Sequence, residues 1–246
     1  MELVAFFVIH WYASLFFQSV FHHRYAAHGL FTMSRTMEKL FYLGCFFTQG
    51  SSYMSASAYG IMHRLHHAHT DTESDPHSPK NTPSILGMLW STRNNYFNIY
   101  SGKTEVDEKF KKNLPDWKSF EKITHNWIVR VMWIGIYTSI YIHFATAWWM
   151  FLFLPITCAM ASLQGAAVNW WAHKFGYVNF RVNNTSKNIL PIDLIFWGEA
   201  YHNNHHRYPN NPNNSAKWFE IDPGYYMMKL LDKLGIIRLK TLAPTV

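Results

Sequence analysis

The chain has little cysteine, which limits what can hold the fold or a cofactor together. Only two of its 246 residues, Cys45 and Cys158, are cysteines, and they show no motif spacing. This excludes a disulfide framework and a cysteine-held iron–sulfur cluster. The sequence also lacks a GxGxxG flavin-binding motif and any zinc-finger, homeodomain or RNA-binding signature. We therefore expect no nucleic-acid partner, and any metal must have ligands other than thiols.

Charged residues are also scarce and are missing from two long stretches. Residues 3–23 and 131–173 contain no Asp, Glu, Lys or Arg. A bilayer core takes about 20 helical residues, so the first stretch fits one crossing and the second fits two, joined by a turn near residues 143–146. Buried helices of a soluble domain are the alternative, but two such runs are too many for a chain of this size. The sequence predicts an all-α integral membrane bundle.

The basic residues predict its orientation. All 22 Lys and Arg residues lie within residues 24–130 and 174–240, which the positive-inside rule places on the cytoplasmic side. The net charge of +7 favours contact with anionic headgroups or acidic substrates. The first helix lacks a basic n-region and a cleavage pattern, so we interpret it as a retained anchor.

Residues 38–62 are apolar but rich in glycine and serine. A crossing there would place His23 and His28 across the membrane from His63, so we expect this helix to lie in the interface. The expected organisation is one domain over residues 1–246, with membrane helices at about 3–21, 123–143 and 147–171, an interfacial helix at about 38–62, and cytosolic parts at 63–122 and 172–246. A histidine-rich di-metal site would lie in the cytosolic helical cap.

Histidine, in contrast, is abundant and patterned. Two triplets have the spacing i, i+3, i+4: His63, His66 and His67, and His202, His205 and His206. On a helix, each triplet places three imidazoles on one face, able to aim at a single point. Neutral imidazole is the commonest metal ligand. The two triplets therefore predict a polynuclear metal site.

Three further histidines complete the candidate set. His23 and His28 follow the first apolar helix. They are five residues apart, or about 140° on a regular helix, so a shared target needs a helix end or a π-type bulge. Asn169 and His173 lie one helical turn apart after the second apolar stretch. Nine imidazoles exceed the coordination of one metal, so we expect two metals with four or five ligands each.

The remaining polar residues have supporting roles. Imidazole ligands need acceptors that fix their tautomers, and Glu199, Asp71 and Asp75 are candidates. The other histidines are interpreted as structural or surface residues: His10, His22, His69, His77, His125 and His143.

Four segments together resemble one known family. HRYAAH (residues 23–28), HRLHH (63–67), NWWAH (169–173) and GEAYHNNHH (198–206) are similar to the histidine boxes of membrane-bound fatty acid desaturases, in particular the acyl-CoA Δ9 or stearoyl-CoA type. The resemblance covers nearly the whole chain. It implies a di-iron centre, Fe2+/Fe3+, held by His23, His28, His63, His66, His67, His173, His202, His205 and His206, with Asn169 acting through a water. It also implies a membrane bundle and a bent acyl tunnel.

Two features depart from the family pattern. Relatives usually carry a further membrane helix before the one that leads into the first box, whereas His23 lies near the start of this sequence. Gly29 follows the first box where many relatives have arginine, which bears on headgroup recognition.

The resemblance implies an O2-dependent desaturase, and the chemistry explains the need for metal. Side-chain acids, bases and nucleophiles cannot remove hydrogen from an unactivated methylene. The expected substrate is a fatty acyl-CoA or acyl-lipid in contact with membrane lipids, and the product is a Δ9-type cis double bond. We expect no catalytic residue beyond the metal ligands, and an external ferredoxin or cytochrome b5-like protein, with its reductase, as electron donor. A membrane hydroxylase of alkyl or carotenoid substrates and a non-catalytic metal transporter are the alternatives.

Overall fold

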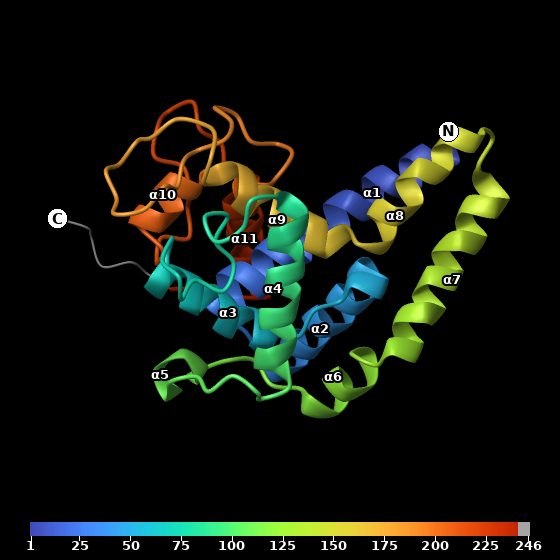
Figure 1. Ribbon diagram of the computed structural model, residues 1–246, viewed down its shortest axis with the longest axis horizontal. Coiled ribbons are helices and arrows are strands. Elements are labelled where there is room, and N and C mark those ends of the chain that lie inside the picture. The colour runs from blue at the N-terminus through green and yellow to red at the C-terminus, as the bar shows by residue number, and fades with distance from the viewer. Residues whose placement is uncertain (241–246) are drawn as a thin grey trace.

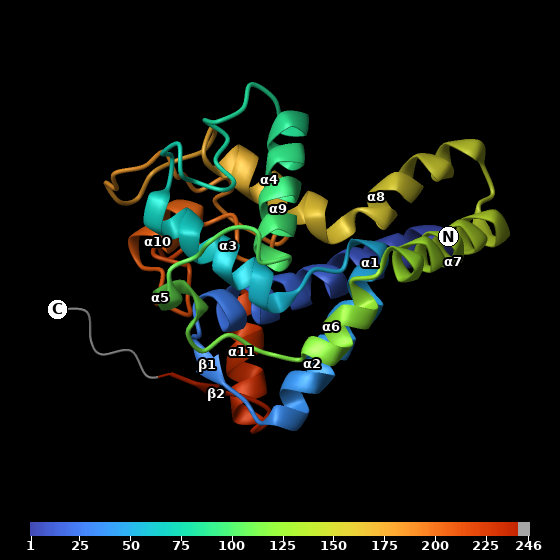
Figure 2. The same ribbon diagram turned by 60° about the horizontal axis from the view of Figure 1, so that its bottom comes forward.

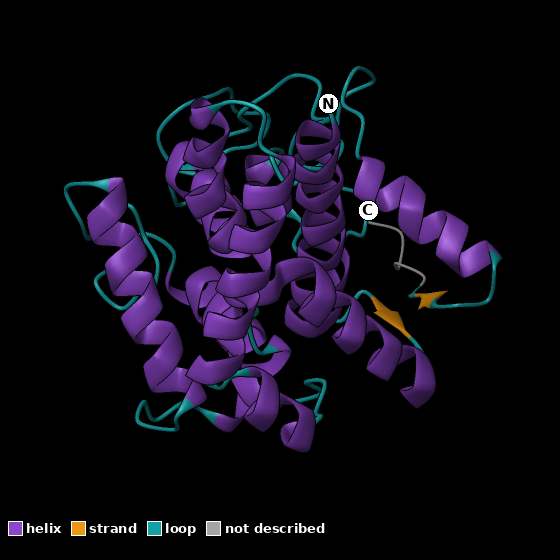
Figure 3. Cartoon of the chain, turned by 90° about the vertical axis from the view of Figure 1, so that its right-hand side faces the viewer, coloured by secondary structure: helices purple, strands orange, loops and turns teal. Residues whose placement is uncertain are grey.

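The structure, a computed structural model that describes residues 1–240, is built of helices (Figure 1; Figure 3). Its described strands are two short segments, β1 (Phe31–Thr32) and β2 (Arg238–Leu239), which pair antiparallel beside α11 (Figure 2). The predicted all-α class is confirmed. In Figure 1, the long helices α1 and α7 extend to the right, and the elements carrying the histidines gather on the left.

The first helix changes its winding where the first histidines begin. α1 (Glu2–Phe17) continues into a π-helix, η1 (Gln18–Ala27). Together they form a 26-residue segment that is long and apolar enough to cross a membrane. The His28 N–H donates to the His23 carbonyl at 3.1 Å, an i to i+5 bond of the π type. The π-type geometry expected between His23 and His28 is thus confirmed.

The prediction of a single helix over residues 38–62 is wrong. The structure has α2 (Arg35–Gln49), a 3-10 turn η2 (Gly50–Ser52) and α3 (Ala56–His69). Gly50 adopts φ +51°, a left-handed conformation that glycine accepts at little cost. The Ser55 hydroxyl then accepts from the Ala58 N–H and caps α3. A glycine stop followed by a serine cap divides this apolar stretch.

The second charge-free stretch forms a hairpin with one bent arm. α7 (Trp127–Phe144) is long and apolar enough to cross a membrane. Instead of one helix over 147–171, the second arm consists of η3 (Trp148–Phe153), α8 (Leu154–Cys158) and α9 (Met160–Ala172), with a 78° bend between Trp148–Cys158 and Met160–Ala172. The break lies at Ala159. Pro155 sits in the first turn of α8, where its missing N–H needs no partner.

The remaining helices form the cap around the histidines. They are α4 (Ile85–Tyr100), α5 (Glu108–Lys111), α6 (Lys118–Thr124), α10 (His202–Arg207) and α11 (Pro223–Lys233). α11 begins at Pro223, and Gly235, at φ +71°, follows its end. Long loops on either side of α10 link these elements (Figure 1).

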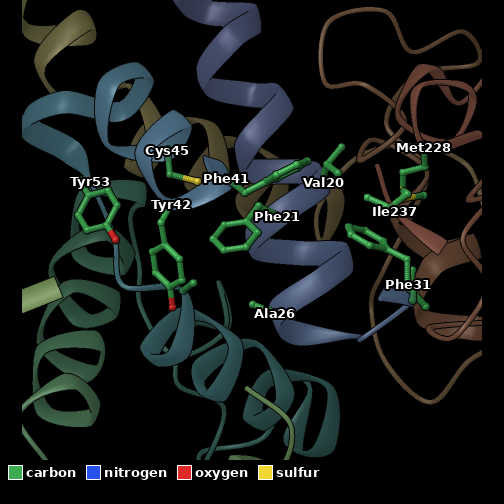
Figure 4. Packing of buried hydrophobic residues seen from close by; sticks show 12 residues of the cluster. Val20, Phe21, Ala26, Phe31, Phe41, Tyr42, Cys45, Tyr53, Met228 and Ile237 are labelled. Atoms are coloured by element: carbon green, nitrogen blue, oxygen red, sulfur yellow. The ribbon is translucent and has the colours of Figure 1, made fainter. Parts of the chain in front are cut away.

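The main apolar core lies around η1 and extends to the C-terminal elements. Val20 and Phe21 from η1 pack with Phe41 and Tyr42 of α2 on one side, and the cluster continues to Met228 of α11 (Figure 4). Burial of such side chains contributes about 25 cal/mol per Å² of apolar area. This core fixes the position of η1, and therefore of the histidines at its end.

A buried ion-pair network crosses the same core. The Arg24 guanidinium, 1% exposed, lies 2.9 Å from Asp222 and 3.3 Å from Glu199. Asp222 is fully buried and also accepts from the backbone N–H groups of Asn214 and Tyr225. The network joins η1 to two segments almost 200 residues away.

We expect Arg24→Met to lower the free energy of unfolding by about 3–5 kcal/mol, because it leaves two buried carboxylates without their cation. Unfolding of the metal-free protein by heat or denaturant measures the change. Arg35→Met is the matched control, since Arg35 is half-exposed and pairs with Glu38 within one helix; its effect should stay below about 1 kcal/mol. Equal losses in the two variants would contradict a special role for the buried network.

Candidate metal centre

The structure brings all nine predicted histidine ligands together in two groups. The first group is His23, His28, His63, His67 and His205, and the second is His66, His173, His202 and His206. Within each group, one nitrogen from every member lies within 4.8 Å of all the others. Six of the nine are buried and three are partly buried. Each group has the composition expected for one metal of a pair.

Each triplet is divided between the two groups, so the expectation that its three imidazoles aim at one point is wrong. On α3, His63 and His67 belong to the first group and His66 to the second; on α10 the assignment is reversed, with His205 alone in the first. At about 100° per residue, positions i and i+4 nearly coincide while i+3 lies to one side. Every i, i+4 pair therefore serves one group, and the remaining histidine serves the other.

The three carboxylates expected to support the histidines each lie near an Nδ1 atom, and Asp75 is hydrogen-bonded to His66. Glu199 lies 2.7 Å from Nδ1 of His23, and Asp75 lies 2.9 Å from Nδ1 of His66. Asp71 lies 3.4 Å from Nδ1 of His173 and also accepts from the backbone N–H and hydroxyl of Thr185. A carboxylate at Nδ1 holds the proton there and leaves Nε2 as a bare acceptor.

The Nε2 atom of each of these three histidines lies close to the Nε2 atom of another histidine. His23 faces His205 at 3.1 Å, His173 faces His202 at 3.1 Å, and His66 faces His206 at 3.3 Å. Two nitrogens bound to one ion at about 2.1 Å and a right angle would lie about 3.0 Å apart. Lone pairs turned towards each other repel unless a cation or a proton lies between them. The donor set therefore fits metal binding, and imidazoles suit iron, zinc, copper or nickel.

Burial keeps the imidazoles in the metal-binding form. It lowers the pKa of His63, His202 and His205 well below the ordinary value, so these rings are neutral at physiological pH. Burial alone would raise the pKa of Glu199, but attraction to His23 and Arg24 outweighs it and lowers that pKa to about 2. Glu199 is therefore a carboxylate throughout the physiological range.

Asn169 lines the smaller cavity that also touches His23, His63 and His202. It is buried in α9, and its Nδ2 donates to the backbone carbonyl of His77. Its Oδ1 is buried with no hydrogen-bond partner among residues 1–240. A buried carbonyl oxygen without a donor is costly, and a bound water would satisfy it.

The structure places one further histidine at the site that the sequence interpretation left out. The His77 ring centroid lies 4.9 Å from that of His66, and the side chain lines the adjacent cavities. Its position two residues after Asp75, which holds His66, is the sequence signal that could have identified it. The buried histidines His10 and His22 and the partly buried His125 lie outside both groups and have polar partners elsewhere.

An apolar path reaches the histidines. A cavity of about 260 Å³ runs from exposed Arg93, past side chains such as Met54, Met62 and Leu89, towards the site. A second cavity of about 60 Å³ touches His23, His63, His202 and Asn169. Both cavities are lined by Gln18, Tyr59, His77 and Gly165, which mark their junction.

Three curated relatives align with most of this chain. The chain is 28% identical over 219 residues to the sn-1 stearoyl-lipid 9-desaturase of Synechocystis, an alignment that covers 88% of this chain and 64% of the relative. It is 28% identical over 250 residues to the hex-5-enoyl-[acyl-carrier protein] acetylenase of Moorena producens, covering 92% and 73%. It is 26% identical to the Delta-9 acyl-lipid desaturase 1 of Arabidopsis thaliana, covering 89% and 68%.

This chain thus spans about two thirds of the length of these relatives. The family model described as Fatty acid desaturase matches residues 2–230, nearly the whole chain. The match includes every segment that carries the histidine groups, and it agrees with the resemblance found in the histidine boxes. The chain belongs to the fatty acid desaturase family.

Proposed function

We propose that this protein is an O2-dependent membrane desaturase that introduces a cis double bond, of the Δ9 type, into a saturated fatty acyl chain. The observation that carries this proposal is the pair of buried histidine groups at the end of an apolar cavity. Family membership and the names of the relatives support it.

Each histidine group holds one iron in this proposal. His23, His28, His63, His67 and His205 are the ligands of the first, and His66, His173, His202 and His206 are those of the second, with Asn169 contributing through a water. When bound, the two irons activate O2 to an oxidant strong enough to break an unactivated C–H bond. The fit of the nine imidazoles described above supports this assignment.

The protein positions the substrate and excludes water from the cavity. The apolar side chains of the larger cavity hold the methylenes of the substrate in a fixed register, and such positioning determines which carbons react. Over the reaction, two adjacent methylenes lose one hydrogen atom each, O2 also takes up two electrons and two protons, and two waters leave. Glu199, Asp75 and Asp71 hold the Nδ1 protons of their histidines throughout, because they stay ionised.

The two electrons come from a separate protein in this proposal. A ferredoxin or a cytochrome b5-like donor with its reductase suits the requirement, since the sequence carries neither a GxGxxG motif nor a cysteine cluster. The donor has to approach the histidine groups from the cap.

The proposed membrane placement follows the apolar segments. α1 with the start of η1, α7, and the bent pair α8 and α9 lie in the bilayer, and the end of η1 and the cap, with the histidine groups, lie on the cytoplasmic side. The basic residues, all outside the charge-free stretches, support this side. Arg93 lies at the mouth of the larger cavity, stacked over Trp90 and Phe97. Its guanidinium suits the phosphate that lipid and thioester carriers of acyl chains share.

Expression in a desaturase-deficient bacterium, together with a working donor, should produce new double bonds that mass spectrometry can locate. His66→Ala and His205→Ala each remove a ligand from one group, so both should abolish the product and lower the iron content. His143→Ala, an exposed histidine far from either group, should do neither. Unchanged lipids despite folded, iron-loaded protein would contradict the proposal, and an alcohol product would identify a hydroxylase.

Loss of a carboxylate that supports a ligand should weaken metal binding without abolishing it. We expect Glu199→Gln to lower metal affinity about 10–100-fold, because the amide no longer stabilises the His23 ring or balances Arg24. Competition with a chelator measures the affinity directly. Glu73→Gln, at an exposed glutamate, is the control and should leave it unchanged. Wild-type affinity in Glu199→Gln would show that the carboxylate does not support the ligand.

A further inference from the structure

We propose that a polar lock between α1 and α9 closes the acyl cavity just beyond the histidines, so that the enzyme takes chains of medium length. Here the polar lock means the Ser14 and Gln164 side chains with the Trp11 carbonyl. The inference rests on the proposed function, because it assumes that an acyl chain occupies the cavities. It adds to that function a limit on the length of the acyl chain beyond the metals.

The lock is a continuous set of hydrogen bonds between two apolar helices. The Ser14 hydroxyl donates to Oε1 of Gln164 at 3.1 Å, and Nε2 of Gln164 donates to the Trp11 carbonyl at 2.9 Å. Ser14 is fully buried and Gln164 is 1% exposed. Polar side chains at this depth in apolar segments are costly and tend to be functional. The hydrogen bonds hold the Gln164 side chain in one place between α1 and α9.

The lock borders the smaller cavity through the Gln164 side chain. Leu15, Gln164 and Val168 line the smaller cavity but not the larger one, so they form its wall away from the junction. Further along α1, towards the N-terminus, lies a third, almost wholly apolar cavity of about 270 Å³, lined by Leu3, Phe7 and residues of α7 and η3.

The residues concerned share one face of α1. Leu3, Phe7, Ser14 and Gln18 are spaced by four, seven and four residues, which is the spacing of one helical stripe. Phe7 lines the third cavity, Gln18 lines the junction, and Ser14 lies between them. The lock therefore lies between the smaller and the third cavity along this stripe, and its hydrogen bonds hold Gln164 in the wall of the smaller one.

The size of the smaller cavity gives the expected chain length. About 10–15 Å³ of such cavity volume is needed for each water-sized group, so about 60 Å³ holds about four to six methylene-sized groups. Because this cavity touches the histidines, those groups include the reacting carbons at positions 9 and 10, so chains of up to about 14 carbons fit. An 18-carbon chain would have to pass the lock.

Binding of acyl chains tests the lock without relying on turnover. Thermal unfolding of the iron-loaded protein is measured with saturated fatty acids of 10 to 18 carbons, since a bound ligand raises the melting temperature. Wild-type protein should be stabilised by chains of up to about 14 carbons, and the 16- and 18-carbon chains should give at most a third of that shift. In Ser14→Ala/Gln164→Ala, which opens the wall, the shift should persist to 18 carbons.

Two single variants separate the effect of the wall from that of altered folding. Gln164→Leu keeps the side-chain volume and should retain the wild-type length profile. Ser139→Ala replaces an exposed serine of α7 that bonds only within its own helix, and it should also retain the profile. Equal stabilisation of the wild type by 12- and 18-carbon chains would overturn the lock, as would a wild-type profile in the double variant.

Product analysis with the same chains distinguishes this inference from the proposed function. Double bonds formed only in the shorter chains by the wild type, and also in 18-carbon chains by the double variant, would support both. Length-selective binding without any double bond would leave the lock standing and defeat the desaturase assignment. Conversely, efficient desaturation of 18-carbon chains by the wild type would establish the function and overturn the lock.

Discussion

The structure depends on one electrostatic constraint: nine imidazoles with buried, inward-facing nitrogens have to be held against their mutual repulsion. Carboxylates lie near three of the outer Nδ1 atoms, and the inner Nε2 atoms of these histidines lie about 3 Å from those of other histidines. A shared cation or proton between such nitrogens removes their repulsion, and burial leaves no bulk water to do so. The cap, the π-helix and the buried ion pairs follow from this need.

Buried ion pairs couple distant segments of the chain and hold the histidines in position. Arg24 directly follows the ligand His23 and joins the carboxylates of Glu199 and Asp222 in the dry interior. Glu199 at the same time holds His23. One network therefore sets the ring orientation of a ligand on η1 and anchors the loop leading into α10. A displacement of either segment would disturb both the ion pairs and the histidine group.

The sequence was sufficient to predict which histidines gather but not how they divide between the two groups. The i, i+3, i+4 spacing of the triplets, the five-residue step from His23 to His28 and the one-turn spacing of Asn169 and His173 together predicted the nine histidines and the π-type turn. Which metal group each histidine joins depends on how α3 and α10 pack against each other, a tertiary property that periodicity does not contain. The role of His77 was hidden for the same reason, since its ring reaches the site through the turn at Asp75.

The sequence pattern also failed to predict the breaks inside the apolar segments. The division at Gly50 depends on a left-handed glycine and a serine cap, and both residue types also occur within membrane helices, so composition alone suggested one helix. At Ala159 the bend has no proline or glycine to announce it, and the nearby Pro155 lies in the first turn of α8. Both breaks line the larger cavity, through Ser52, Tyr53 and Met54 at one and Ala161 at the other. Continuous helices would pack against each other along their length, and the larger cavity exists because the helices are interrupted at these two breaks.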